Sequence, residues 1–166
     1  MINREGKNEK PDVLDILKIG MVVVLIVYIG ALLVMNGNSK VPFQTVAKAV
    51  EKKADAKTME KAGARELRKY YGLNAKDYDG TLFYRAKSAM GVEELLLIKV
   101  KNPSQAETVE ASIERRVEGQ KKNFEGYGVE QTKLLNDAVW ETKGNYIFLS
   151  IAKHAENLQK TFRKSL

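Results

Sequence analysis

The chain has 166 residues, with 28 Lys and Arg against 21 Asp and Glu, which gives a formal net charge of +7. It contains no cysteine and a single histidine, which excludes disulfide bonds, Cys-ligated zinc, iron–sulfur clusters, thiol nucleophiles, lipid-modified cysteines and multi-histidine metal sites. We therefore expect one globular domain after any anchor is set aside, and no metal or cofactor.

An apolar segment runs from Ile19 to Met35, seventeen consecutive residues without a charge. A helix of this length rises about 25 Å, at the short end for a membrane span. The segment has no polar face, which is not typical of a core helix in a small domain. It is longer than the apolar part of an ordinary signal peptide, and it ends in LLVMNGNSK without a convincing cleavage site. These features favour an uncleaved anchor over a core helix or a cleaved signal.

The orientation of this anchor is predicted from the charged residues on either side of the apolar segment. Four basic residues precede the apolar segment and four follow it within eighteen positions, so the positive-inside comparison is almost even. A polar leader with Lys18 at the membrane edge favours leader inside and domain outside. We predict a cytoplasmic leader over 1–18, a transmembrane anchor over 19–35, a linker over 36–42 and an extracytoplasmic domain over 43–166.

The first part of this domain combines helical and strand patterns. Apolar residues at helical spacing predict two helices, or one helix broken at Gly63: Phe43, Val46, Val50, Met59, Leu67 and Tyr70. GLNAKDYDG then forms a turn-rich loop. TLFYRAK and LLLIKVK alternate in polarity, and the short link between them predicts an antiparallel hairpin.

The second part begins with a predicted helix. Ser104 and Glu107 have the spacing of a capping box, and a helix of about four turns follows them. A glycine-rich turn, in which we expect Tyr127 to pack on the sheet, leads to a short helix. AVWETKGNYIFLSIA predicts a second hairpin around Gly144, with Trp140 in the core. An amphipathic helix closes the chain.

The order of these elements predicts the fold class. It reads anchor, α, α, β, β, α, short α, β, β, α. The economical arrangement is an α+β domain of two layers, with a four-stranded, mainly antiparallel sheet made of two hairpins and with helices packed on one face.

Three successive segments resemble a known family. They are LRKYYGLNAKDYDGTLFYRAKSAMGVEELLLIKVK, RRVEGQKKNFEGYGVEQTKLL and KGNYIFLSIAKHAE. In this order they resemble the bacterial extracytoplasmic family catalogued as domain of unknown function 4358. The resemblance implies a domain held at the outer face of a Gram-positive cytoplasmic membrane, often through a lipidated cysteine in related chains. This chain has no cysteine and carries an apolar segment instead. The resemblance implies no activity and no catalytic residues.

Motifs of enzymes are weak in this sequence. DYDG begins like a calcium loop, but Ser88 stands where such a loop needs its bidentate Glu, so we interpret it as an acidic turn. GYG lacks the context of a nucleotide fingerprint. His154 is the only histidine, and a pocket joining it to Asp79 or Asp137 would favour a hydrolase of the cell envelope.

Basic residues are the stronger functional indication. Four of them cluster on and after one helix and are candidate contacts for an anionic partner: Arg115, Arg116, Lys121 and Lys122. We predict a non-enzymatic envelope interaction module, whose partner is another envelope protein, an anionic wall polymer or lipid headgroups. With the opposite topology it would be a cytoplasmic polyanion-binding domain. Nucleic acid is disfavoured, because most tyrosines fall in apolar periodic segments rather than beside the charges.

Overall fold

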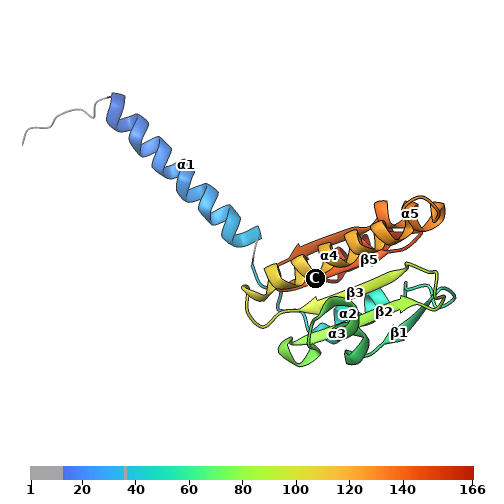
Figure 1. Ribbon diagram of the computed structural model, residues 1–166. Coiled ribbons are helices and arrows are strands. Elements are labelled where there is room, and N and C mark those ends of the chain that lie inside the picture. The colour runs from blue at the N-terminus through green and yellow to red at the C-terminus, as the bar shows by residue number, and fades with distance from the viewer. Residues whose placement is uncertain (1–12, 36) are drawn as a thin grey trace, which may run out of the picture. The chain divides into compact units, whose positions relative to one another are not determined.

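The computed structural model describes residues 13–35 and 37–166 and divides the chain into two units, Met1–Gly37 and Asn38–Leu166 (Figure 1). Helix α1 (Val13–Met35) belongs to the first unit. It begins inside the predicted leader, whose residues 1–12 lie outside the described part, as does residue 36 of the predicted linker. Side chains of residues 30–35 also lie outside it. Among the described residues, no helix has both the length and the apolar character needed to cross a membrane.

The second unit holds a five-stranded sheet and five α-helices. The elements in chain order are α2 (Phe43–Glu51), β1 (Met59–Ala62), α3 (Ala64–Tyr71), a 3₁₀ turn (Ala75–Asp77), β2 (Gly80–Ala86), β3 (Glu94–Lys99), α4 (Gln105–Phe124), α5 (Val129–Asn136), β4 (Val139–Lys143), β5 (Tyr146–Ile151) and α6 (Ala155–Ser165). The strand order is β1-β2-β3-β5-β4, and every neighbouring pair is antiparallel. The predicted α+β class is therefore confirmed.

The prediction of four strands is wrong because β1 was assigned to a helix. Met59 is buried, and β1 pairs with β2 so that Met59 lies opposite Ala86. The helical spacing from Met59 to Leu67 is accidental, since the chain is extended at Gly63 and α3 begins only after it. Pairing with β2 satisfies backbone groups that a free sheet edge would expose, an effect that side-chain periodicity does not record.

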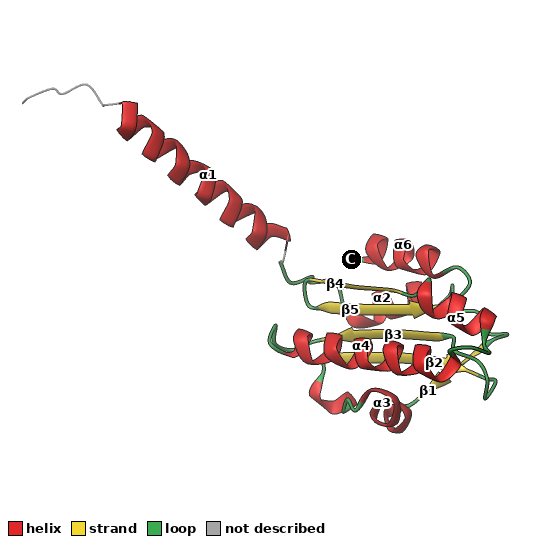
Figure 2. Cartoon of the chain, turned by 45° about the horizontal axis from the view of Figure 1, so that its top comes forward, coloured by secondary structure: helices red, strands yellow, loops and turns green. Residues whose placement is uncertain are grey.

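The prediction that helices cover one face is also wrong, because helices pack on both faces of the sheet (Figure 2). On one face, α3, α4 and α5 cover a core that includes Phe83, Leu96 and Ile147. On the other, α2 and α6 cover a core that includes Leu97 and Phe148. All six residues of β5 are buried, as expected for a strand at the centre of a three-layer arrangement.

Three local predictions also fail, whereas the second hairpin is confirmed. Gly144 has φ 60° and supplies the positive φ that the two-residue turn before β5 requires. Trp140 is 44% exposed because it lies on edge strand β4, and Tyr127 is 64% exposed in the turn after α4. Ser104 makes no side-chain capping bond; instead, the Gln105 side chain accepts hydrogen bonds from the backbone N–H groups of residues 101 and 102.

Candidate functional site

The two ends of the sheet lie next to different parts of the chain. At one end the preceding segment is attached: Val41 O accepts hydrogen bonds from Tyr146 Oη at 2.8 Å and from Lys99 Nζ at 3.0 Å. Ile151 ends β5 at the opposite end, where it is paired with Glu94. A six-residue strand spans about 17 Å between these ends. Any site at the far end is therefore well separated from the point at which residues 38–41 join the domain.

A groove of about 810 Å³ opens at this far end of the sheet. Its floor includes the apolar side chains of Met59, Leu134 and Leu158. One wall comes from α6 and the residues just before it, and it carries Lys153, Lys160 and Lys164 without any acidic side chain. Asn157, Lys160, Thr161 and Lys164 recur every three or four residues, so they share one side of α6 over about two turns.

The facing part of the groove is acidic. Glu130 and Asp137 come from α5 and its C-terminal boundary, and Glu93 comes from the loop before β3. Lys133 lies among them, but its ammonium group forms an ion pair with Asp137 at 2.6 Å. Within the part of the chain that the structure describes, the three lysines of the α6 wall form no ion pair. The groove therefore presents lysines on its α6 side and carboxylates on the side of α5 and the loop before β3, and the segment between α2 and β1 adds one charge of each sign, Lys53 and Asp55.

A smaller hollow of about 350 Å³ adjoins the groove and shares Thr58, Glu93, Glu130 and Leu134 with it. Its wall is completed by the loop between β2 and β3, which is held to α5 by a 3.2 Å hydrogen bond from Gln131 Nε2 to Met90 O. The two hollows lie side by side at the far end of the sheet.

His154 and Asp137 both line the groove, whereas Asp79 lies at the other end of the sheet, where its N–H donates to Lys99 O. One of the two carboxylates considered for a hydrolase therefore shares a hollow with the histidine. No hydrogen bond joins His154 to Asp137 in the described structure, and Lys133 holds the Asp137 carboxylate. No three described His, Asp or Glu residues gather to hold a metal ion.

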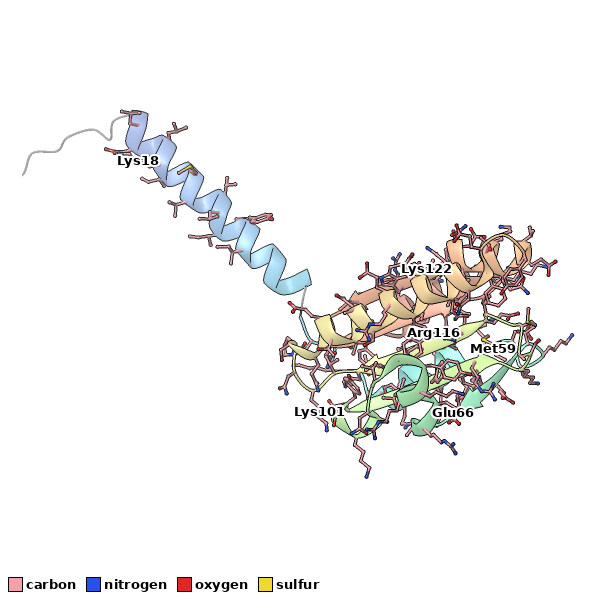
Figure 3. All side chains as sticks on the ribbon, viewed as in Figure 1. Lys18, Met59, Glu66, Lys101, Arg116 and Lys122 are labelled. Carbon is pink, nitrogen blue, oxygen red and sulfur yellow. The ribbon has the colours of Figure 1, made fainter. Side chains whose placement is uncertain are left out.

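The four predicted anion contacts do not form one surface. Arg116 points inward and is 22% exposed, and Lys121 pairs with Glu118 at 3.0 Å. Arg115 and Lys122 are exposed and make no ion pair among the described residues. Figure 3 shows Arg116 and Lys122 at separate positions along α4. Two of the four cations are thus engaged by carboxylates of the same domain.

The inward turn of Arg116 is explained by Glu94, a buried carboxylate at the start of β3 that is 2% exposed. Glu94 Oε1 accepts hydrogen bonds from Arg116 Nε at 3.0 Å, from Arg116 Nη2 and from Gln120 Nε2 at 2.9 Å. Its other oxygen accepts from the Tyr71 hydroxyl. Burial, followed by the negative charge of Glu94, raises the pKa of Tyr71 well above 10, so this phenol is a donor at neutral pH. We call these four residues the Glu94 network.

The sequence analysis missed the Glu94 network, although one signal was present. Ser112, Arg116 and Gln120 are spaced by four residues, on the same side of α4 as the apolar residues of its buried stripe. A polar row inside a buried stripe indicates a polar partner on the opposing layer. Which strand residue supplies that partner depends on strand order, which the sequence pattern does not contain.

The comparisons with known proteins identify a family. The model described as Domain of unknown function (DUF4358) matches residues 52–152, a range that includes all five strands, the acidic part of the groove and the Glu94 network. No curated protein and no solved structure matches the chain. The resemblance seen in the sequence is confirmed, and the chain belongs to the DUF4358 family.

Proposed function

We propose that this protein is a single-pass, membrane-anchored interaction module of the cell envelope, whose domain lies outside the cytoplasm and has no enzymatic activity. The uncharged run from Ile19 to Met35 supports the anchor, as does α1, whose described apolar side chains from Leu17 to Ile29 are exposed. Exposed apolar surface around a whole helix is unfavourable in water and favourable in lipid. The outward orientation rests on the polar leader and on the family resemblance.

The observation that carries the interaction role is the groove with oppositely charged walls. A partner segment that carries both positive and negative side chains complements both walls, whereas a polyanion is attracted by the α6 wall and repelled by the acidic wall. We therefore propose that the occupant is a segment of another envelope protein. Anionic wall polymers are the alternative occupant.

Two other partners are less well supported. Anionic lipid headgroups, like other polyanions, are attracted by the α6 wall and repelled by the acidic wall, which disfavours them as the ligand of the groove. Its described lining contains no Phe, Tyr or Trp side chain, and strands of nucleic acid are commonly held by stacking on such rings. Arg115 and Lys122 remain proposed contacts for an anionic partner elsewhere on the domain.

Charge reversal of each wall separately tests the occupant. A photo-crosslinking residue at Thr161, on the α6 side of the groove, is introduced into the full-length chain in cells of the source organism. With a protein partner, Lys160→Glu/Lys164→Glu and Glu130→Lys/Asp137→Lys each reduce the adduct by about tenfold or more. The matched control, Lys69→Glu/Lys76→Glu, reverses two exposed lysines outside the groove and leaves the adduct unchanged.

The same variants separate the alternatives. A polydisperse adduct that weakens with the lysine reversal and strengthens with the acidic reversal indicates an anionic polymer and contradicts the protein occupant. An adduct that is absent from the wild-type chain, or that is insensitive to both reversals, contradicts the groove as a binding site.

Location is tested independently by protease treatment of intact cells. We expect digestion of the 43–166 region, with the remaining fragment in the membrane fraction. Protection until lysis contradicts the outward orientation and favours the cytoplasmic polyanion-binding alternative. A soluble full-length chain contradicts the anchor.

An envelope hydrolase is the second candidate, because His154 and Asp137 line the same groove. It predicts turnover of p-nitrophenyl esters that is lost in His154→Ala. The binding module predicts no turnover above that of His154→Ala and an unchanged adduct in that variant.

A further inference from the structure

A third hollow, separate from the groove and from the hollow beside it, lies between α3 and α4 and has a volume of about 190 Å³. It is lined by Tyr70 of α3 and by Arg115, Arg116, Gly119, Gln120 and Asn123 of α4. The lining contains two guanidinium groups and no acidic side chain. Its volume is below the 300 to 1,000 Å³ of ordinary drug-sized sites, so it suits a small molecule or one end group of a larger one.

Arg116 is held in a fixed orientation at this hollow. Its Nε and Nη2 donate to Glu94, and its guanidinium carbon lies 4.5 Å from the centre of the Tyr70 ring. Tyr71 and Gln120 take up further lone pairs of Glu94, so the carboxylate cannot easily turn away. Arg116 Nη1 has no hydrogen-bond partner among the described residues, which leaves one edge of the guanidinium group with donors to spare.

A buried ion pair is a costly way to stabilise a fold, since apolar side chains of similar volume are often equally stabilising or better. Its advantage is orientation. Two layers of the domain, β3 and α4, meet at the Glu94–Arg116 pair, which fixes the guanidinium group before any ligand arrives. Binding groups that are oriented in advance lose less conformational freedom on association.

Gly119 is a second feature that favours a binding site at this hollow. It lies in the interior of α4, where glycine is less favourable than alanine. A Cβ atom at this position would meet no heavy atom within 4 Å, so packing does not require glycine. The missing side chain keeps the hollow open beside both arginines.

We propose that the hollow between α3 and α4 binds a small oxyanion, either a carboxylate or a phosphate group, between Arg115 and the unoccupied edge of Arg116. The planar guanidinium group matches the paired oxygens of both anions, and Asn123 provides a neutral donor at the rim. Glu94 and Tyr71 act as positioning residues for Arg116. This site is independent of the groove and of its proposed occupant.

The test uses the purified full-length chain in mild detergent, titrated separately with inorganic phosphate and with acetate. The Arg116 Nε–H resonance is followed by NMR. We expect one of the two anions to give saturable shifts in the millimolar range, which identifies the ligand class. Arg115→Gln weakens this binding by about tenfold or more, because a charge-assisted contact is lost. Gly119→Leu fills the hollow and abolishes binding.

Lys48→Gln is the control, because it removes one exposed charge from α2, which covers the opposite face of the sheet. It should change the affinity by less than about twofold. Circular dichroism of Gly119→Leu checks that the helix is intact, and Arg115→Gln provides the second variant should that check fail. The proposal is overturned if neither anion saturates up to about 10 mM. It is also overturned if folded Gly119→Leu binds like the wild-type chain, or if Lys48→Gln and Arg115→Gln weaken binding equally.

Discussion

The two faces of the sheet are both buried, but they bury different kinds of side chain. The α2/α6 face is built on aromatic and aliphatic contacts, such as the stacked rings of Phe148 and Phe162 with centroids 4.9 Å apart. The α3/α4/α5 face encloses the Glu94 network within an otherwise apolar core. The first face obtains its stability from area removed from water. The α3/α4/α5 face buries polar side chains in place of some apolar area, and in return it holds the Arg116 guanidinium group in a fixed position at a surface hollow.

The largest effect should come from breaking the Glu94–Arg116 pair. Arg116→Ala leaves a buried carboxylate without its cation and should lower the free energy of unfolding by about 3 to 5 kcal/mol. The double variant Glu94→Leu/Arg116→Leu should be more stable than Arg116→Ala. Urea titration of the full-length chain by circular dichroism measures both, and Lys121→Ala is the exposed-pair control. A loss of less than about 1 kcal/mol for Arg116→Ala would show that water already reaches Glu94.

The effect of burial is tested with two aromatic residues, Phe162 on the α2/α6 face and Trp140, whose partner Leu149 in β5 belongs to the core of the other face. Phe162 is 0% exposed, so Phe162→Ala should cost about 3 to 5 kcal/mol, the usual cost of removing a buried aromatic ring. Trp140 is 44% exposed, so Trp140→Ala should cost about 1 kcal/mol or less. The same urea titrations compare them. Equal losses would contradict the position of Trp140 on an uncovered sheet edge.

Ser150 is the exception on the apolar face. By strand alternation its side chain lies with Tyr146 and Phe148, and its buried hydroxyl has no hydrogen-bond partner in the described structure. Ser150→Ala removes this unpaired group, so it should raise the free energy of unfolding by up to about 1 kcal/mol. Thermal unfolding of the full-length chain is a sufficient measurement. A destabilisation of similar size would indicate that the hydroxyl is satisfied in solution.

The smallest effect concerns a half-buried carboxylate, Glu51, which contrasts with the fully buried Glu94. Hydrogen bonds from Lys61 at 2.8 Å and from the Tyr84 hydroxyl lower the pKa of Glu51 below its ordinary 4.5. Because the folded-state pKa is the lower one, the stabilisation is present above about pH 4.5 and disappears as the pH falls through the folded-state value. Glu51→Gln should therefore cost about 0.3 kcal/mol at pH 7 and less than that at pH 3. Urea titrations at the two pH values measure this difference, and a pH-independent cost would contradict the assignment.

Local patterns were sufficient for most elements of the domain. The alternation in TLFYRAK and LLLIKVK correctly placed β2 and β3, and Gly144 correctly marked the turn before β5, because strand alternation and positive φ are properties of a few adjacent residues. The family was also recognisable from three successive segments. The same patterns failed at β1, a short edge strand whose four residues match a helical spacing as well as an extended one.

The candidate sites could not be predicted from hydrophobic periodicity, because they depend on distances between residues that are far apart in the sequence. Four basic residues of one helix looked like a single surface in the sequence, yet Arg116 turns inward because β3 places Glu94 beneath it. Likewise, the lysines of α6 and the acids of α5 line one groove only because α5 ends and α6 begins near the same end of the sheet.

The sequence by itself determined the elements with strong local signals, the apolar segment, the absence of cysteine chemistry and the family. The tertiary structure decided the number of layers, the fifth strand and the charges that meet across a hollow. The physical reason is range: propensity, turn geometry and amphipathic spacing act within a few residues, whereas burial and charge pairing depend on neighbours that the strand order brings together from distant positions.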